Sequence, residues 1–487
     1  MASTITRRSF VTGTASALAL ASIPELGFAA TPNVIRLEWQ VFKTTPHYAS
    51  FLNAIRTMRA TADSSKPASW QYWSNVHSNY CPHGVAYFLT WHRGYIYYFE
   101  QQLRTVSGDN TLTLPYWDYY TYPVMPSEFT DTASGNPLYT SRVNTNVYQA
   151  LDLSPFARSV ANFQRGTSNA FETKLENAPH NPVHDIIGGY MADIMTAPLD
   201  PIFYLHHANL DRLWNAWSLR STSKVPAANN KYWSGSFTYA TNLTMTKAKT
   251  RTTTGLGYDY ANDTVPVILL PQAERGGIIR VQAQMSPISG RPQIGTFTAS
   301  AGRTVSSTRR SLGGVKGVAL ADNSISARIP LQAANATLLR DTLAVAPEAD
   351  DSSAVESQAQ SQSQAARPAA SGFRHVNLVL DGVSMPAAAR AGGFFYNVYV
   401  NLPATGDPDA QRDAHFVGTL GAFEVSTATH HGGSSIEFPV TELLARAGVA
   451  NPNEVVVSFV RVSGVNAVKG TAISIGEMRV ELAADAP

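Results

Sequence analysis

The chain has 487 residues and a formal net charge of +2, from 37 basic and 35 acidic side chains. This balance lacks the basic excess of a nucleic-acid-binding surface and the acidic excess of a charged tail, so we expect no nucleic-acid partner. The length exceeds that of one ordinary hydrophobic core, which favours two or more domains.

The first thirty residues have the pattern of a twin-arginine signal peptide. TRRSFV (residues 6–11) runs into an apolar stretch (residues 11–23), and GFAA (residues 27–30) offers small residues for cleavage. The apolar stretch is too short to span a membrane, and no other segment has a transmembrane pattern. We therefore expect residues 1–30 to be removed and the protein to be exported to the periplasm or secreted.

Residues 31–265 have the pattern of a mainly helical domain. Apolar residues at helical spacing predict a helix over 48–60, an aromatic helix over 90–103, and shorter helices at 144–151, 168–175 and 183–191. All eight tryptophans lie between Trp39 and Trp233, so this domain can bury a dense aromatic core.

The second half of the chain changes to alternating apolar and polar residues. Residues 266–346 have short strand patterns, and we expect an extended connector with strands. Residues 347–371 are rich in Ser, Gln and Ala and lack aromatic residues, which predicts a disordered, protease-sensitive linker. Short alternating segments in 372–487 predict an antiparallel β-sandwich or barrel.

Histidines gather in two stretches of the helical domain. VHSNYCPHGVAYFLTWHRGYIYYFE (residues 76–100) and PHNPVHDIIGGYMADIMTAPLDPIFYLHHANLDRLW (residues 179–214) together offer six candidate metal ligands: His77, His83, His92, His180, His184 and His207. Six imidazoles, with no carboxylate or thiolate obviously among them, suit copper, zinc, nickel or iron. Two groups of three favour a pair of redox metals that share a small ligand.

The neighbouring residues His206 and His207 point about 100° apart on a helix, so they cannot both face one ion easily. His207 shares a helix face with Phe203 and Asp211 and is the expected ligand. We expect His206 beside the ligands, Phe203 packed on the His207 ring, and Asp211 paired with an arginine such as Arg93.

The two stretches resemble the copper-binding motifs of the tyrosinase and catechol oxidase family, the type-3 dicopper proteins. The resemblance implies a four-helix bundle that holds two copper ions, with O2 as co-substrate. It places the first three histidines of the set above at one copper and the last three at the other. Tyr258-Asp259-Tyr260 resembles the family's tyrosine motif, which Arg36 would face. FFYNVYVNLP, HFVGTLGAF and AISIGEMRVEL resemble the C-terminal domain of plant polyphenol oxidases.

The resemblance also implies roles for residues around the metals. Cys81 would form a thioether bond with His83, while Glu176 and Asn181 would hold a water that helps to deprotonate a phenol. Ile194 would form an aliphatic roof over the first copper and leave room for a phenol ring. Asp185, which follows His184, would disfavour substrates that carry a carboxylate.

The expected function is ortho-hydroxylation of monophenols and oxidation of o-diphenols to o-quinones. The resemblance implies a latent form, covered by the C-terminal domain until a protease cuts the linker. A catechol oxidase or o-aminophenol oxidase without monophenol activity is the alternative, followed by a haemocyanin-like oxygen carrier. A zinc or iron hydrolase would be expected to include a carboxylate ligand. The sequence leaves a homo-oligomer open.

Overall fold

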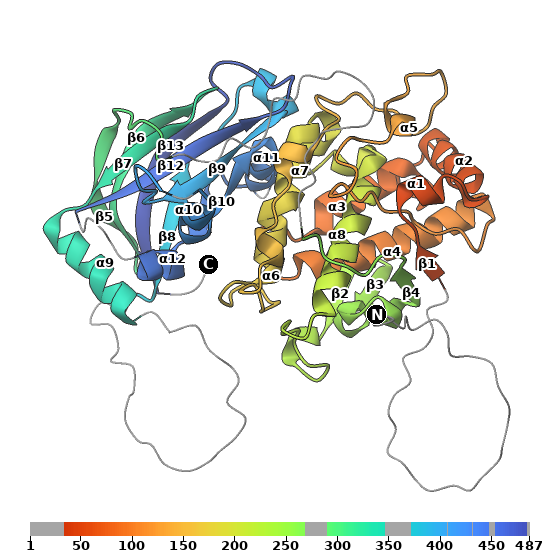
Figure 1. Cartoon of the computed structure of the whole chain (residues 1–487), viewed down its shortest axis with the longest axis horizontal. Helices are drawn as coiled ribbons and strands as arrows, with labels where there is room; N and C mark the ends of the chain where they lie inside the picture. Colours follow the sequence, from red (N-terminus) through yellow and green to blue (C-terminus); the bar gives the residue numbers. More distant parts are fainter. Residues whose placement is uncertain are drawn as a thin grey trace, which may run out of the picture.

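The computed structural model describes residues 34–267, 290–345, 372–406, 408–430, 432–447 and 453–484 (Figure 1). These residues form a helical body (34–267) and a β-sandwich built from the described residues between 290 and 484. The predicted signal peptide at 1–30 and the predicted linker at 347–371 lie outside the described residues. Among the described helices, none is long and apolar enough to cross a membrane.

The helical body consists of a few long helices joined by short ones and by loops. Its α-helices are α1 (Trp39–Phe42), α2 (His47–Ala60), α3 (Trp70–Tyr80), α4 (Phe88–Ser107), α5 (Ser127–Thr130), α6 (Phe171–Leu175), α7 (Asn181–Ile187) and α8 (Ile202–Ser218). Its single turns are η1 (Tyr148–Ala150), η2 (Ser154–Phe156), the π-helical η3 (Glu176–His180), η4 (Gly189–Ala192), η5 (Ala197–Leu199), η6 (Lys231–Trp233), η7 (Lys247–Arg251) and η8 (Thr254–Leu256).

Two small sheets complete the body. β1 (Val34–Arg36) pairs in parallel with β4 (Tyr258–Tyr260), which joins the two ends of this part of the chain. β2 (Ser236–Ala240) and β3 (Leu243–Thr246) form an antiparallel hairpin.

The predicted helices differ in how well they match the structure. The helices expected at 48–60 and 90–103 correspond to α2 and α4, whereas 144–151 forms only the short turn η1. The helix expected at 183–191 is α7, which ends at Ile187 because Gly188 adopts a φ of +67°.

The predicted aromatic core of the body is present, and all eight tryptophans are buried. Phe99 of α4 stacks on Tyr204 of α8, with ring centroids 3.6 Å apart and planes inclined by 8°. His92 lies two turns before Phe99, and His207 lies one turn after Tyr204, so each histidine shares a helix face with a packed ring. The core thereby fixes the two helices that carry these histidines.

The second part of the chain is a β-sandwich of antiparallel strands, as predicted. One sheet has the order β11-β8-β13-β6-β5 and the other β10-β9-β12-β7. The strands are β5 (Thr298–Ser306), β6 (Arg309–Leu320), β7 (Ile325–Pro330), β8 (His375–Asp381), β9 (Phe394–Val400), β10 (Phe416–Gly421), β11 (Ile436–Pro439), β12 (Glu454–Ser463) and β13 (Ile473–Ala483). The helices are α9 (Ala333–Val345), α10 (Pro408–His415), α11 (Ala422–His430) and α12 (Thr441–Ala447), with the turn η9 (Ala387–Ala391).

Residues 266–346 were predicted to form a connector outside the sandwich, and this prediction is wrong for β5, β6 and β7. β6 pairs with β13 along most of its length, β5 pairs with β6, and β7 pairs with β12. These strands therefore belong to both sheets of the sandwich, because their apolar faces are buried in the same core as those of β8 to β13. The predicted linker at 347–371 thus interrupts the sandwich sequence and does not separate it from the helical body.

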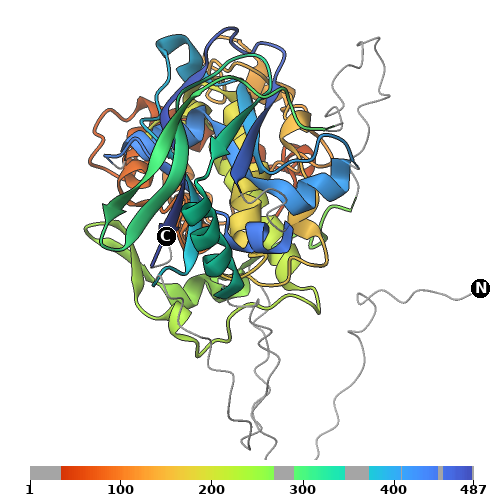
Figure 2. The ribbon, with the colours of Figure 1, turned by 90° about the vertical axis from the view of Figure 1, so that its left-hand side faces the viewer.

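The sandwich packs directly on the helical body, and Figure 2 views the molecule from the sandwich side with the body behind it. β9 is buried on both faces: Tyr396 and Val398 lie in the sandwich core, while Phe395 packs into the core of the body. At the same interface α11 lies beside α7 (Figure 1). This contact brings the sandwich to the histidine-rich part of the body.

Candidate metal centre

Seven buried histidines form two groups in the middle of the helical body. The first group comes from α3, the following loop and α4, and contains His77, His83 and His92. The second comes from η3, α7 and α8, and contains His180, His184, His206 and His207. Within each group the candidate ligand nitrogens lie within 4.8 Å of one another. Each group therefore has the size of a single metal site.

The two groups adjoin each other and form one centre. The rings of His92 and His207 stack with centroids 4.5 Å apart, and those of His83 and His180 stack with centroids 5.6 Å apart. One member of each pair belongs to each group. This arrangement suits two metal ions that are close enough to share one small ligand.

Hydrogen bonds at the outer nitrogen orient four of the rings. Three of these rings donate their Nδ1 hydrogen to a backbone carbonyl. His77 donates to the carbonyl of Ile194 at 3.1 Å, His92 to that of Phe88 at 2.8 Å, and His184 to that of Met191 at 2.8 Å. The side-chain oxygen of Asn181 accepts from His180 Nδ1 at 2.7 Å. Because a carbonyl oxygen can only accept, Nδ1 carries the hydrogen, and the lone pair lies on Nε2.

The Nε2 atoms of these four rings face the centre without a donor to satisfy them. His77 Nε2 and His92 Nε2 are 3.3 Å apart, and the buried Nε2 atoms of His180 and His184 have no hydrogen-bond partner among the described residues. Adjacent lone pairs in a buried space repel each other unless a cation lies between them. The orientation of the rings therefore fits metal ligation.

Burial keeps these rings neutral. It lowers the pKa of His92 and of His184 from 6.5 to about 3, and it lowers the pKa values of His77, His180, His206 and His207 well below 6.5, with neighbouring histidines adding to the effect in each of these four. Neutral imidazole is the form that binds metal. A set of imidazoles without a carboxylate in either group is compatible with copper.

His206 and His207 take different positions, as their spacing predicts. The His207 ring lies 4.5 Å from His92 and 5.1 Å from His180, so it contacts both groups. The His206 ring lies 5.0 Å from His184 on the side that faces Tyr119, whose ring is 5.6 Å away. The geometry favours His207 as the ligand, although the nitrogens of His206 are also close enough to belong to the second group.

Aromatic rings surround the histidines and exclude water. The Phe203 ring lies 4.2 Å from that of His207, which is the contact expected from the sequence. Phe88, which the sequence prediction missed, lies 4.6 Å from His180 and 4.8 Å from His92. Phe88 lies one turn before His92 on α4, and this helical spacing was the signal for it.

The sandwich supplies one more ring, Phe423 of α11. It stacks on His184 with centroids 4.1 Å apart and lies 5.4 Å from His83 and 5.5 Å from His180. Phe423 is 1% exposed and contacts histidines of both groups. The side chain that covers the centre, which the sequence left unidentified, is therefore Phe423.

Glu176 and Asn181 lie beside the second group, but their side chains already have partners. Glu176 Oε1 accepts from the backbone N–H of Gly84 at 2.7 Å, and Oε2 forms an ion pair with Arg165. Asn181 holds His180 as described above and does not cap α7. Since a carboxylate has about four acceptor positions, Glu176 can still accept a hydrogen bond from a water.

Ile194 was expected as a roof over the first copper and Asp185 as an acidic residue that disfavours carboxylated substrates, and here both are fully buried under the sandwich. Asp185 Oδ1 accepts the backbone N–H of Phe423 at 2.8 Å. The backbone N–H of Ile194 donates to Ser426 Oγ at 3.1 Å, and its carbonyl orients His77. In this arrangement Asp185 faces α11 rather than a substrate, because α11 occupies the space in front of it.

Cys81 follows α3, where its backbone N–H donates to the carbonyl of His77 at 3.0 Å. The thiol is buried, and burial raises its pKa well above 9.0. A protonated, buried thiol is a poor nucleophile in the absence of metal. The thioether bond to His83 remains a prediction.

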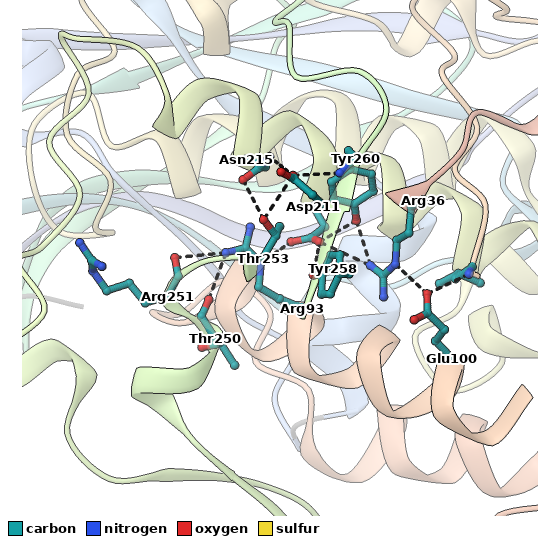
Figure 3. Close-up of polar contacts among 12 residues, drawn as sticks. Arg36, Arg93, Glu100, Asp211, Asn215, Thr250, Arg251, Thr253, Tyr258 and Tyr260 are labelled. Carbon is teal, nitrogen blue, oxygen red and sulfur yellow. Dashed lines mark hydrogen bonds and ion pairs between the residues drawn. The ribbon is translucent and has the colours of Figure 1, made fainter. Parts of the chain in front are cut away.

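A buried polar network supports α4 and α8 behind the centre (Figure 3). Arg93 donates to Asp211 at 2.5 Å, which confirms the expected pair, and Tyr258 and Tyr260 each donate a hydroxyl to Asp211 at 2.6 Å. Arg36 donates to Tyr260 at 3.0 Å, so it faces the tyrosine motif as the resemblance implies. Asp211 lies one turn after His207, and this network fixes that turn.

Comparison with known families matches both parts of the chain. Residues 54–150 and 128–220 match the common central domain of tyrosinase, and residues 353–477 match the chloroplastic polyphenol oxidase C-terminal domain. The first match contains all seven histidines of the centre. The second contains most of the sandwich, including Phe423.

Individual relatives align mainly over the helical body. Tyrosinase HcTyr1 of Hahella sp. (strain CCB-MM4) is 34% identical over 199 residues, which cover 34% of this chain and 43% of that protein. Catechol oxidase B, chloroplastic, of Solanum tuberosum is 29% identical over 259 residues, which cover 41% of this chain and 44% of that protein. The chain thus spans less than half the length of these curated relatives.

Solved structures align over both parts. A structure of latent apple tyrosinase covers 94% of this chain and 99% of its own, with a TM-score of 0.48 and 20% identity. A latent aurone synthase (polyphenol oxidase) covers 93% of this chain and 90% of its own, with a TM-score of 0.47 and 19% identity.

Proposed function

Because the chain belongs to the tyrosinase family of type-3 copper proteins, we propose that it binds two copper ions and uses O2 to oxidise phenols. The observation that carries this proposal is the pair of adjoining groups of buried, neutral imidazoles, whose Nε2 atoms face one common space. The ligands would be His77, His83 and His92 for one ion and His180, His184 and His207 for the other.

Copper, when bound, supplies the electron transfer to O2. The chain supplies the rest. The carbonyls of Phe88, Met191 and Ile194 hold three rings in one tautomer, and the aromatic rings around them keep water from the centre. A phenol would enter where Phe423 now lies, because that ring already fits against His184.

The finer proposal is that both monophenols and o-diphenols are substrates. A phenol has a pKa of about 10, so its hydroxylation needs a proton acceptor in the site. Burial raises the pKa of Glu176 above 4.5, against the opposing effect of Arg165, and this makes the carboxylate a better base near neutral pH. Glu176 and Asn181 would hold the water that takes the phenol proton.

One observation favours the alternative of an o-diphenol oxidase without monophenol activity. Both oxygens of Glu176 are already bound, one by the Gly84 N–H and the other by Arg165, and these bonds oppose the rise in pKa that burial causes. If these two hydrogen bonds persist during turnover, Glu176 accepts a proton from the water less readily, and a monophenol is deprotonated less readily.

Assays of a monophenol and its o-diphenol on the copper-loaded, uncovered chain distinguish an enzyme that acts on both substrates from one that oxidises only the o-diphenol. With both activities present, Glu176→Gln should lower monophenol turnover by about a hundredfold and lower diphenol turnover much less. Glu172→Gln is the matched control, because Glu172 is also buried and lies one turn earlier. Absence of monophenol turnover in the unmodified chain, with diphenol turnover intact, would establish the alternative.

The packing of the sandwich supports a latent form. Phe423 fills the space that a phenol would need, and α11 buries Asp185 and Ile194. In the uncovered chain Asp185 would lie next to His184 at the entrance, where it is predicted to disfavour phenols that carry a carboxylate. Equal turnover of tyrosine and tyramine, unchanged by Asp185→Asn, would contradict that role.

A further inference from the structure

The start of α11 has only half of an ordinary helix cap within its own domain. Glu424, in the first turn, accepts the backbone N–H of Gly421 at 2.8 Å and the hydroxyl of Thr419 at 2.6 Å. This is the returning half of a capping box. The other half requires a side-chain oxygen on the residue that precedes the helix, and that residue is Gly421, which has no side chain.

The missing half comes from the helical body. Asp185 of α7 reaches across the interface, and its Oδ1 accepts the Phe423 N–H at 2.8 Å. Phe423 is the second residue of α11, and its N–H is one of the first four that a helix leaves without an internal partner. The backbone carbonyl of Asp185 also accepts the N–H of Gly393 at 2.7 Å, so the same residue contacts the sandwich twice.

The glycine at position 421 is explained by this carboxylate. A Cβ at Gly421 would lie well inside van der Waals contact of Oδ2 and Cγ of Asp185. Gly421 does not adopt a positive φ, so its backbone conformation does not itself require glycine. The residue therefore makes room for a side chain from the other domain.

We propose that Asp185 is the N-cap of α11, supplied from the helical body, and that this bond positions Phe423 over the centre. Phe423 carries both the capped N–H and the ring that stacks on His184. The body also holds α11 further along, where Ser426 donates to Asp193 at 2.9 Å and His430 contacts the carbonyl of Ser78 at 2.6 Å. The residue predicted to select substrates in the open form thus holds the cover in the closed form. This inference rests on the proposed function in one respect, namely that α11 covers the centre at which phenols would be oxidised.

Hydrogen exchange of the metal-free full-length chain tests the cap without relying on oxidase activity. In the peptide that contains residues 421–424, Asp185→Ala and Gly421→Ala should each speed exchange by about tenfold, because the Phe423 N–H loses its acceptor. Asp185→Asn keeps a side-chain oxygen and should stay within about twofold of the unmodified chain. Gly433→Ala is the matched glycine control, since its Cβ would meet the Ala428 oxygen at an ordinary 3.6 Å.

Protection of amides in β13 shows whether a variant has lost only the cap or its whole fold. If Gly421→Ala also loses protection of the β13 amides, that variant has unfolded the sandwich. The result for Asp185→Ala then decides whether the cap exists, because Asp185 lies in the helical body and its substitution leaves the sandwich sequence unchanged. Unchanged exchange of residues 421–424 in Asp185→Ala would overturn the cap. Faster exchange in the Asp185→Ala chain, together with no phenol oxidation by the copper-loaded, uncovered chain, would leave the cap standing and count against the proposed function alone.

Discussion

The ring of Phe423 stacks on the ring of His184, with centroids 4.1 Å apart and planes inclined by 22°. His184 belongs to the histidine centre, and Phe423 is the second residue of a helix of the sandwich. The hydrogen bond from His184 Nδ1 to the carbonyl of Met191 holds the His184 ring in place. The face of that ring is therefore available to an aromatic partner, which is Phe423 in the covered chain and would be a phenol in the open one.

Removal of the Phe423 ring should uncover the centre without any cut in the chain. Phe423→Ala loses about 3 kcal/mol of packing at the interface, which is roughly a hundredfold in the balance between covered and open forms. We expect the copper-loaded, full-length variant to oxidise an o-diphenol many times faster than the unmodified chain. Thr429→Ala is the control, because Thr429 lies on the same helix and, among the described residues, its hydroxyl donates to carbonyls of that helix. A rate equal to that of the unmodified chain would show that Phe423 does not limit access.

The position of a cut in the chain should decide whether the cover leaves. β5 to β7 precede residues 347–371 and β8 to β13 follow them, yet the two sets share both sheets. A cut at 347–371 should therefore leave the pieces associated and the activity low. A cut at 268–289 removes the covalent tie between the whole sandwich and the body, so the sandwich can dissociate as one unit and the activity should rise.

Two chains test this, each with one specific protease site inserted at either position. Gel filtration and o-diphenol oxidation are measured after the cut, and the uncut chains serve as controls. Full activation by the cut at 347–371, with release of β8 to β13, would contradict the sheet topology as the cause of latency.

A partly buried ion pair between the two parts should make the cover sensitive to acid. Arg412 of α10 donates to Asp152 of the body at 2.7 Å. Burial pushes the pKa of Asp152 up, but Arg412 and the N–H and hydroxyl groups of Ser154 outweigh it, so the pKa lies below 3.8. Ser154 belongs to the body and acts in both forms, so any acid dependence of docking comes from the charge of Arg412. The pair stabilises docking above about pH 4 and loses this effect as the pH falls further.

Asp152→Asn should weaken docking by about 2 kcal/mol at neutral pH, because it leaves the partly buried Arg412 without a counter-charge. It should also remove the acid-dependent step. The measurement is the fraction of sandwich that elutes with the body after a cut at 268–289, between pH 7 and pH 3. Asp63→Asn, which changes an exposed carboxylate away from the interface, should behave like the unmodified chain. Identical pH profiles for both variants would exclude the ion pair as the cause.

A thioether between Cys81 and His83 should lower the mass of the copper-loaded protein by two hydrogen atoms. Protein made without copper should keep the full mass and a thiol that reacts after unfolding. Cys81→Ser should abolish the mass difference and weaken copper retention by about tenfold, because the His83 ring loses its restraint. A copper-loaded chain with full mass and a free thiol would disprove the bond.

The histidine centre could be predicted from the sequence because helical spacing and motif order constrain it locally. The structure brings the six predicted histidines together, places Phe203 against His207, and pairs Asp211 with Arg93. Helix α3 was missed, although Trp70, Trp73 and His77 recur at helical spacing. The sandwich was predicted because alternating residues identify strands reliably when one face is buried.

The features that were missed all depend on contacts between distant parts of the chain. Alternation predicted strands in 266–346 but not their partners, so these strands were assigned to a connector. Asp185 was expected to face substrates, yet its partner Phe423 lies 238 positions away. No local pattern indicates that one particular helix of the sandwich, rather than another, meets the centre.

Copper content and o-diphenol oxidation, measured together on a chain cut at 268–289, test the central claim most directly. We predict two copper ions per chain and oxygen-dependent oxidation of the o-diphenol. The oxidation should disappear when copper is removed and return when it is restored. An uncovered chain that holds two copper ions and oxidises no o-diphenol would contradict the account.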